Sequence, residues 1–178
     1  MTGLELLEGP GTEPLTLAEV KEALRIEDEA EDALLLRLIA VARRRCEQAT
    51  GLSMIAQRWR LTLDRWPGER VMLPFRPVAS VEAVRVAGAD LSPESYRVEK
   101  EEGGLLATCA WPAPGLRYGG IEVDFTSGFG LSWNDVPEGL RQGMLMLAAA
   151  LYEAREGEGE GLPAGVWALW SPYRRVRL

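Results

Sequence analysis

Apolar residues recur at helical spacing in two stretches near the N-terminus. In the first, Leu17, Val20 and Leu24 follow Thr16, whose hydroxyl can form a capping box with Glu19, so a short helix is predicted over residues 16–25. The second stretch has one continuous stripe at spacings of 4, 3, 4 and 3: Leu35, Ile39, Ala42, Cys46 and Ala49. This stripe predicts a helix from about residue 29 to Thr50, with Gly51 placed to end it.

The period changes to two over Gln57–Asp64, where Trp59, Leu61 and Leu63 alternate with polar residues. Such alternation predicts a half-buried strand. Turn-forming residues separate five further segments with strand character: Arg70–Leu73, Val81–Val86, Tyr96–Glu99, Leu105–Thr108 and Gly120–Thr126. Short strands at this spacing predict a small antiparallel sandwich or barrel-like sheet.

Helical spacing returns after the strands. Leu140, Met144, Leu147 and Leu151 form an apolar stripe, and Asp135 with Glu138 can cap the start of a helix that ends near residue 154. A linker rich in glycine and glutamate follows at residues 157–161.

We therefore expect an α+β fold. Two N-terminal helices plus one long C-terminal helix would form a helical bundle, with an inserted small antiparallel β-sheet or sandwich and an extended C-terminal arm. The expected boundaries are residues 1–56 and 131–156 for the bundle, 57–130 for the β domain, and 157–178 for the linker and arm.

Composition excludes several kinds of chemistry. The 178 residues include no histidine, which removes Ser-His-Asp and Cys-His nucleophiles and any histidine-ligated metal. Cys46 and Cys109 lack the CxxC spacing and cannot form a zinc site alone. Thr126–Gly130 lies between a strand and a helix but lacks phosphate-loop spacing, so a tight turn with a positive φ is predicted. We predict no catalytic residues, no metal and no cofactor.

The chain is acidic, with a formal net charge of −7. Net acidity argues against a protein that coats nucleic acid. The first residues have no basic region followed by a long apolar run, so we expect neither a signal peptide nor a membrane partner. The charge is uneven: residues 1–32 hold ten acidic residues, and residues 37–60 hold six arginines.

The C-terminal segment combines aromatic and basic residues. Its distinctive members are Trp167, Trp170, Tyr173, Arg174, Arg175 and Arg177. Trp, Tyr and Arg are the residue types that dominate interface hot spots. The segment could fold back and cover the chain's own core, or it could dock in a groove of another chain.

An ordered set of motifs over nearly the whole chain resembles the head–tail connector (adaptor) proteins of long-tailed phages and gene transfer agents. The set comprises Pro14–Lys21, Leu24-Arg25, Asp32–Leu35, Ile39–Ala42, Ala49–Gly51, Gln57–Trp59, Leu73-Pro74, Pro77-Val78, Ser80-Val81, Tyr96–Val98, Val123–Gly130, Val136-Pro137, Leu140–Gln142 and Pro172–Arg174. Where family members often have a longer loop, this chain has the compact segment Leu105–Gly119.

The resemblance implies a structural, non-enzymatic protein of the neck of a phage-like particle, assembled in the bacterial cytoplasm. It implies a homo-oligomeric ring of twelve copies beneath the portal protein, which extends the DNA channel and supports the next tail-side connector (stopper). DNA would pass through the lumen without specific binding. Family adaptors typically hold the portal with their C-terminal segments, which here contain Trp167, Trp170, Tyr173, Arg174, Arg175 and Arg177.

A ring needs two different, complementary faces on each subunit. The charge distribution suggests that Arg43, Arg44 and Arg45 on one copy meet Glu29, Glu31 and Asp32 on the next. Two other classes of function remain open from the sequence: a peripheral DNA-binding module, and a hydrolase that uses carboxylates alone.

Overall fold

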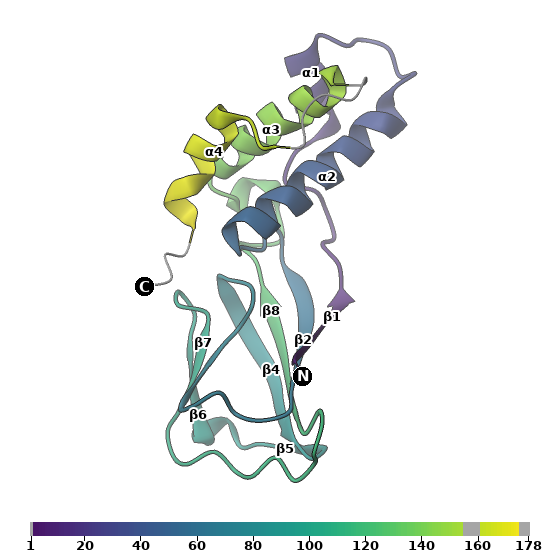
Figure 1. Ribbon diagram of the computed structural model, residues 1–178. Helices are drawn as coiled ribbons and strands as arrows, with labels where there is room; N and C mark the ends of the chain where they lie inside the picture. The colour runs from purple at the N-terminus through teal and green to yellow at the C-terminus, as the bar shows by residue number, and fades with distance from the viewer. Residues whose placement is uncertain (1, 155–160, 175–178) are drawn as a thin grey trace. The chain divides into compact units, whose positions relative to one another are not determined.

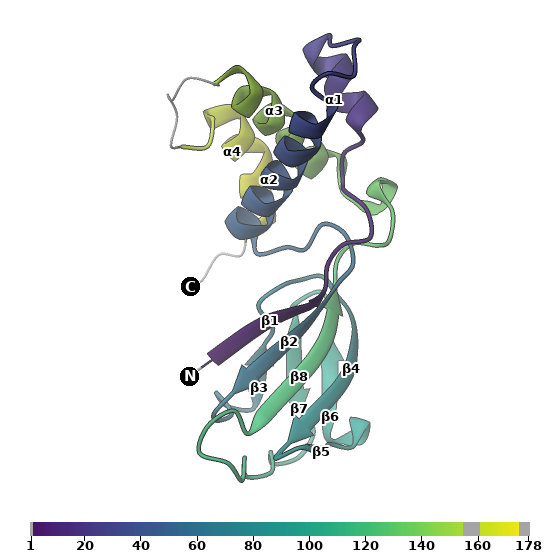
Figure 2. The ribbon, with the colours of Figure 1, turned by 90° about the vertical axis from the view of Figure 1, so that its right-hand side faces the viewer.

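The computed structural model describes residues 2–154 and 161–174, and the chain divides into two compact units (Figures 1 and 2). The β unit contains the residues up to Gly11 and Ala56–Phe129, and the helical unit contains Thr12–Ile55 and the residues from Gly130 onward. The predicted α+β class is confirmed. No helix within the described ranges is long and apolar enough to cross a membrane.

The helical unit begins where the capping box predicted. Glu19 N donates to the Thr16 hydroxyl over 3.2 Å, and Thr16 N donates to the Glu19 carboxylate over 2.8 Å. The main helices are α1 (Leu17–Leu24), α2 (Asp32–Thr50), α3 (Glu138–Glu153) and α4 (Ala164–Trp170). Short 3-10 turns form η2 (Trp133–Asp135) and η3 (Ser171–Tyr173).

Two predicted helix starts were wrong. Helix α2 begins at Asp32 instead of about residue 29, because the preceding acidic residues form a turn in which Ala30 N donates to the Asp28 carboxylate over 2.9 Å. Helix α3 begins after Pro137 without a side-chain cap. Asp135 instead caps η2, where its carboxylate accepts a hydrogen bond from Ser132 N.

The apolar stripes of the long helices form the helical core. On α2, Leu35, Ile39 and Cys46 are buried, and Gly51 ends the helix with a φ of 70°. The buried part of the α3 stripe consists of Leu140, Met144 and Leu147. The stripes were therefore located correctly, although Ala49 and Leu151 at their C-terminal ends are half-exposed.

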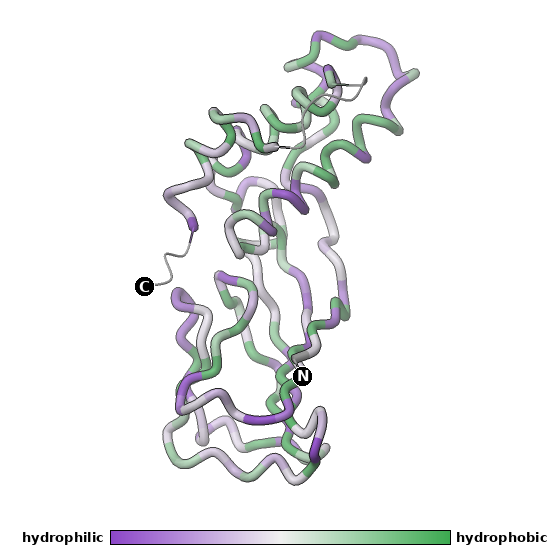
Figure 3. Tube along the Cα trace, viewed as in Figure 1, coloured by the Kyte–Doolittle hydropathy of each residue, from purple (hydrophilic) through white to green (hydrophobic). Residues whose placement is uncertain are grey.

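The β unit is an antiparallel sandwich, as predicted. Its strands are β1 (Thr2–Glu8), β2 (Gln57–Leu63), β3 (Arg70–Met72), β4 (Val78–Val86), β5 (Ala89–Asp90), β6 (Tyr96–Glu99), β7 (Gly104–Ala107) and β8 (Ile121–Ser127). One sheet has the order β1-β2-β8-β4-β5, and the other has the order β3-β7-β6. Leu61, Val71, Leu105 and Phe125 are among the buried residues that join the two sheets, and polar and apolar positions alternate along the strands (Figure 3).

The first strand was missed, and residues 1–11 belong to the β unit instead of the helical bundle. Strand β1 pairs antiparallel with β2, so that Leu4 lies opposite Leu61 and Leu6 lies opposite Trp59. This segment is a strand because it pairs with β2, which is distant in sequence. Local periodicity does not reveal such a pairing.

The predicted extended arm is also wrong for the described part of the C-terminal segment. Helix α4 packs against α3, and Trp170 is fully buried. A Cβ added to Gly143 of α3 would lie 2.2 Å from Trp170 Nε1, so the indole occupies the space that this glycine leaves open. Trp170 Nε1 donates to the Leu140 carbonyl over 3.3 Å.

Replacing Gly143 with alanine should destabilise the protein. Alanine favours a helix by about 1 kcal/mol over glycine, but the methyl group displaces Trp170, and overpacking costs about 1–3 kcal/mol. We expect a lower free energy of unfolding in denaturant titrations followed by tryptophan fluorescence. Gly11→Ala is the control, because a Cβ there meets nothing within 4 Å. Equal or greater stability of Gly143→Ala would contradict this packing.

Candidate functional site

The C-terminal segment places its aromatic residues in two different environments. Trp170 belongs to the helical core and offers no surface to a partner in this structure. Trp167, on the same helix, is 40% exposed. The predicted docking set is therefore divided by the fold: one tryptophan fixes α4 to α3, and the other faces solvent.

A cation and an aromatic ring meet on this exposed side. The Arg174 guanidinium lies 4.6 Å from the centroid of the Trp167 ring, and Arg174 Nε donates to the Ala49 carbonyl over 3.1 Å. Ala49 lies in the last turn of α2, where backbone carbonyls lack helical partners and a cation is favoured. Tyr173 is half-buried beside Gly139 of α3. Arg175 and Arg177 lie outside the described residues.

The three consecutive arginines of α2 point in different directions. Arg43 is buried: its Nε donates to Glu13 over 2.8 Å and its Nη1 donates to Glu47 over 2.9 Å. Glu47 also accepts from Met54 N over 3.1 Å, so this group joins three parts of the helical unit. Arg43 is thus unavailable as the intersubunit contact predicted from the sequence, whereas Arg44 is exposed and Arg45 is partly exposed.

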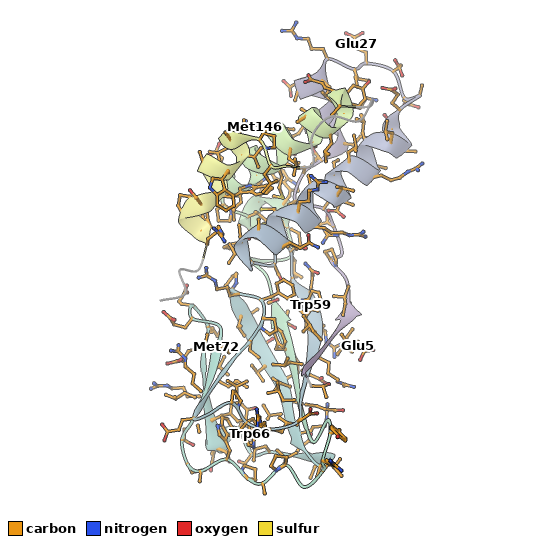
Figure 4. The ribbon with its side chains drawn as sticks, in the orientation of Figure 1. Glu5, Glu27, Trp59, Trp66, Met72 and Met146 are labelled. Atoms are coloured by element: carbon orange, nitrogen blue, oxygen red, sulfur yellow. The ribbon has the colours of Figure 1, made fainter. Side chains whose placement is uncertain are left out.

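The predicted acidic contacts are divided in the same way. Glu29 is exposed in the loop between α1 and α2, where Figure 4 also labels Glu27. Glu31 accepts a hydrogen bond from the Tyr152 hydroxyl, and Asp32 forms an ion pair of 2.8 Å with Lys21. The loop therefore keeps solvent-exposed carboxylates, but Glu31 and Asp32 already have partners within the subunit.

Sequence reasoning missed the apolar residues beside the exposed arginine. On α2, Leu36 is 50% exposed and Val41 is 36% exposed, and both lie outside the buried stripe. Arg37 and Arg44 are exposed on the same helix. Leu36 and Val41 could have been recognised in the sequence as apolar residues outside the buried stripe of α2. With Arg37 and Arg44 they give a surface that combines apolar and cationic groups, as protein interfaces do.

The β unit has its own charged cluster on the outer face of the five-stranded sheet. Arg60 donates to both oxygens of Asp124, over 2.6 and 2.8 Å, and Arg85 donates to one of them over 2.9 Å. The hydrogen bond from Arg60 lowers the pKa of Asp124 to about 2, burial opposes this change, and Arg85 adds to the lowering. Asp124 thus stays ionised and links β2, β8 and β4.

Other sequence candidates have structural roles. The tight turn predicted at Thr126–Gly130 is confirmed by Gly128, whose φ is 144°. Burial raises the pKa of the Cys46 thiol, which lies 4.0 Å from the Met54 sulfur. Within residues 2–154 and 161–174, no group of three or more His, Cys, Asp or Glu side chains could hold a metal ion.

Comparisons with known proteins point to one kind of assembly. The sequence family described as head completion protein matches residues 13–158. A chain from the neck of an empty GTA particle, computed with C6 symmetry, is 32% identical, with a TM-score of 0.86 over 99% of this chain and 97% of that one. No curated protein matches the chain.

Two further solved structures are similar. A chain from the virion of a native gene transfer agent (GTA) particle is 31% identical, with a TM-score of 0.85 over 98% of this chain and 96% of that one. A chain from the neck of a native GTA particle, computed with C12 symmetry, is 31% identical, with a TM-score of 0.83 over 99% and 97%.

The Asp124 cluster predicts a pH-dependent loss of stability. A carboxylate whose pKa is lowered by folding stabilises the protein above its ordinary value near 3.8, and this stabilisation is lost as pH falls towards about 2. Asp124→Asn should lower the free energy of unfolding at pH 7 by roughly 2 kcal/mol, and the difference from wild type should shrink below pH 4. Asp90→Asn is the control, because Asp90 also pairs with Arg85 but is 80% exposed. Equal effects of the two substitutions at pH 7 would refute this role of Asp124.

Proposed function

Since the chain belongs to the head completion protein family and is a head–tail connector protein, we propose that it forms a ring beneath the portal of a phage-like particle, where it joins capsid to tail. The strongest support is the likeness to a chain of a GTA particle neck over 99% of this chain. The C6 and C12 symmetries of the similar necks support a ring of twelve copies. Such a part acts by assembly and needs no catalysis.

The neighbouring subunits of the ring meet through charged surfaces of the helical unit. One face is the exposed side of α2, which carries Arg37 and Arg44 together with the exposed apolar residues Leu36 and Val41. The opposing face is the acidic loop before α2, with Glu29 at its centre. Like a head-to-tail contact in any closed ring, this interface joins two different patches. Arg43, Glu31 and Asp32 hold these elements in place from within the subunit.

Charge reversal on α2 should prevent ring formation. In Arg37→Glu/Arg44→Glu, two exposed cations become anions that face the acidic loop of the next copy, and like-charge contacts oppose association. We expect roughly tenfold or greater loss of rings on isolated portal, counted by electron microscopy. Arg97→Glu/Arg117→Glu is the matched control, since both arginines are exposed on the β unit. Lysines at Glu27, Asp28 and Glu29 in the α2 variant should restore assembly; wild-type rings from the α2 variant would refute this interface.

The portal is held by the exposed side of the C-terminal segment. Trp167, Tyr173 and Arg174 form this surface in the described residues, and Arg175 and Arg177 follow in sequence. Trp170 contributes indirectly by fixing α4 on α3. An exposed aromatic ring with a cation over it has the composition of an interface hot spot. The stopper protein is the partner on the tail side.

DNA passes through the ring lumen without specific binding. The net charge of −7 supports this, because a like-charged wall weakens adhesion of phosphates. The chain would then guide the DNA and leave its movement unhindered.

Removing the exposed aromatic–cation pair should weaken portal binding without unfolding the protein. Trp167→Ala/Arg174→Ala is expected to lower affinity for the isolated portal by about tenfold or more, as hot-spot residues do, in a surface-binding assay. The control is Arg117→Ala/Tyr118→Ala, since that cation lies 5.4 Å from the centroid of an exposed ring in the β unit. Equal binding by both variants would exclude the α4 surface. Deletion of Val166 onward is unsuitable because Val166 and Trp170 are core residues.

A further inference from the structure

A pocket of about 970 Å³ lies at one end of the β unit. Its walls come from two loops, residues 63–67 at the end of β2 and residues 117–118 before β8. These loops meet where β2 ends and β8 begins, at the pair formed by Leu63 and Ile121. The chain passes to and from the helical unit at the opposite end of both strands.

Contacts between the two loops hold the pocket in shape. The Trp66 ring, labelled in Figure 4, stacks on the Trp111 ring, with the centroids 4.1 Å apart and the planes 9° from parallel. Trp66 Nε1 donates to the Pro112 carbonyl over 2.8 Å, and the Asp64 carboxylate accepts a hydrogen bond from Gly119 N over 2.8 Å. Because the loops are already fixed to each other, little conformational freedom remains to be lost when a partner binds.

The pocket leaves two cations and an aromatic ring available to a partner. Arg65 and Arg117 are exposed, and neither forms an ion pair within the part of the chain that the structure describes. The Arg117 guanidinium lies 5.4 Å from the centroid of the Tyr118 ring, which is 67% exposed. The adjacent Leu116 is 55% exposed. Arginine and aromatic residues around a preformed hollow have the composition of an interface hot spot.

The charges of the pocket favour an acidic protein segment as the occupant. A guanidinium binds a carboxylate through two parallel hydrogen bonds, as Arg60 binds Asp124 in the same unit. A segment with a carboxylate beside an apolar residue would therefore pair with the arginines and cover Tyr118. Asp64 also lines the pocket, which disfavours DNA, since a polyanion binds through cations placed along its backbone.

We propose that this pocket, with Arg65, Trp66, Arg117 and Tyr118 in its walls, receives an acidic segment of the stopper protein. The inference rests on the proposed function and assigns a surface to the tail-side partner. A carboxylate of the segment pairs with the two arginines, and its apolar residue packs against the two aromatic rings. The surfaces proposed above for the portal and for the neighbouring copy belong to the helical unit, so the pocket of the β unit serves a third partner.

Binding of isolated stopper protein to rings of the full-length chain on isolated portal tests the proposal. Arg65→Glu/Arg117→Glu should weaken this binding by roughly a hundredfold, because like charges then face each other in the pocket. Tyr118→Ala should weaken it about tenfold. Arg65→Lys/Arg117→Lys keeps the charges but not the two parallel hydrogen bonds, and should lie between wild type and the glutamate variant. Arg58→Glu/Arg97→Glu is the matched control, since these arginines are exposed on the β unit outside the pocket.

Several outcomes would overturn this inference. One is binding of the stopper by Arg65→Glu/Arg117→Glu with the wild-type affinity. Another is failure of this variant to form rings on portal, since the pocket would then face the neighbouring copy or the portal. A third is a DNA fragment that wild-type rings retain and this variant releases, which would make the pocket a nucleic-acid site. Wild-type rings that do not bind the stopper would also overturn it and leave the ring intact, whereas failure of wild-type rings to form on portal would overturn the proposed function itself.

Discussion

The indole of Trp170 occupies the surface of α3 that Gly143 leaves without a side chain. This contact determines the position of α4, because a buried tryptophan has few alternative places in a close-packed core. Val166 and Trp170, four residues apart on α4, are buried, whereas Trp167 is 40% exposed and its ring is in reach of Arg174, which also contacts the end of α2. The surface proposed for the portal is thus a consequence of a core contact.

The same division between inner and outer roles applies to the charged residues. Arg43 and Arg44 are adjacent in sequence, but successive helix residues are separated by about 100° around the axis. One is consequently buried with Glu13 and Glu47, and the other is exposed. In the β unit, Asp124 binds two arginines of neighbouring strands in a comparable way. Such pairs hold the subunit together, whereas exposed charges such as Arg44 and Glu29 are available for assembly.

An uncovered edge strand can pair with strands of other chains, which promotes aggregation of a monomer but can serve as a contact in an assembly. The leucines of β1 are only half covered within the subunit, although their partners in β2 are part of the sandwich core. A component that is completed by its neighbours can leave such an edge uncovered until assembly. Exposed apolar residues of this kind are then explained by assembly and not by the stability of the isolated subunit.

The sequence alone determined the elements that depend on neighbouring residues. Periodicity located the long helices and six strands, and the Thr16–Glu19 capping box and Gly51 marked helix ends correctly. Tertiary structure decided the features that depend on residues distant in sequence. Strand β1 forms because it pairs with β2, and α4 packs on α3 because the Trp170 indole fits beside Gly143. Arg43 is buried in the subunit, where it donates a hydrogen bond to Glu13. The candidate site was therefore predicted as a set of residues but not as a surface. Composition indicates which side chains can bind a partner, whereas exposure results from contacts between residues far apart in the chain.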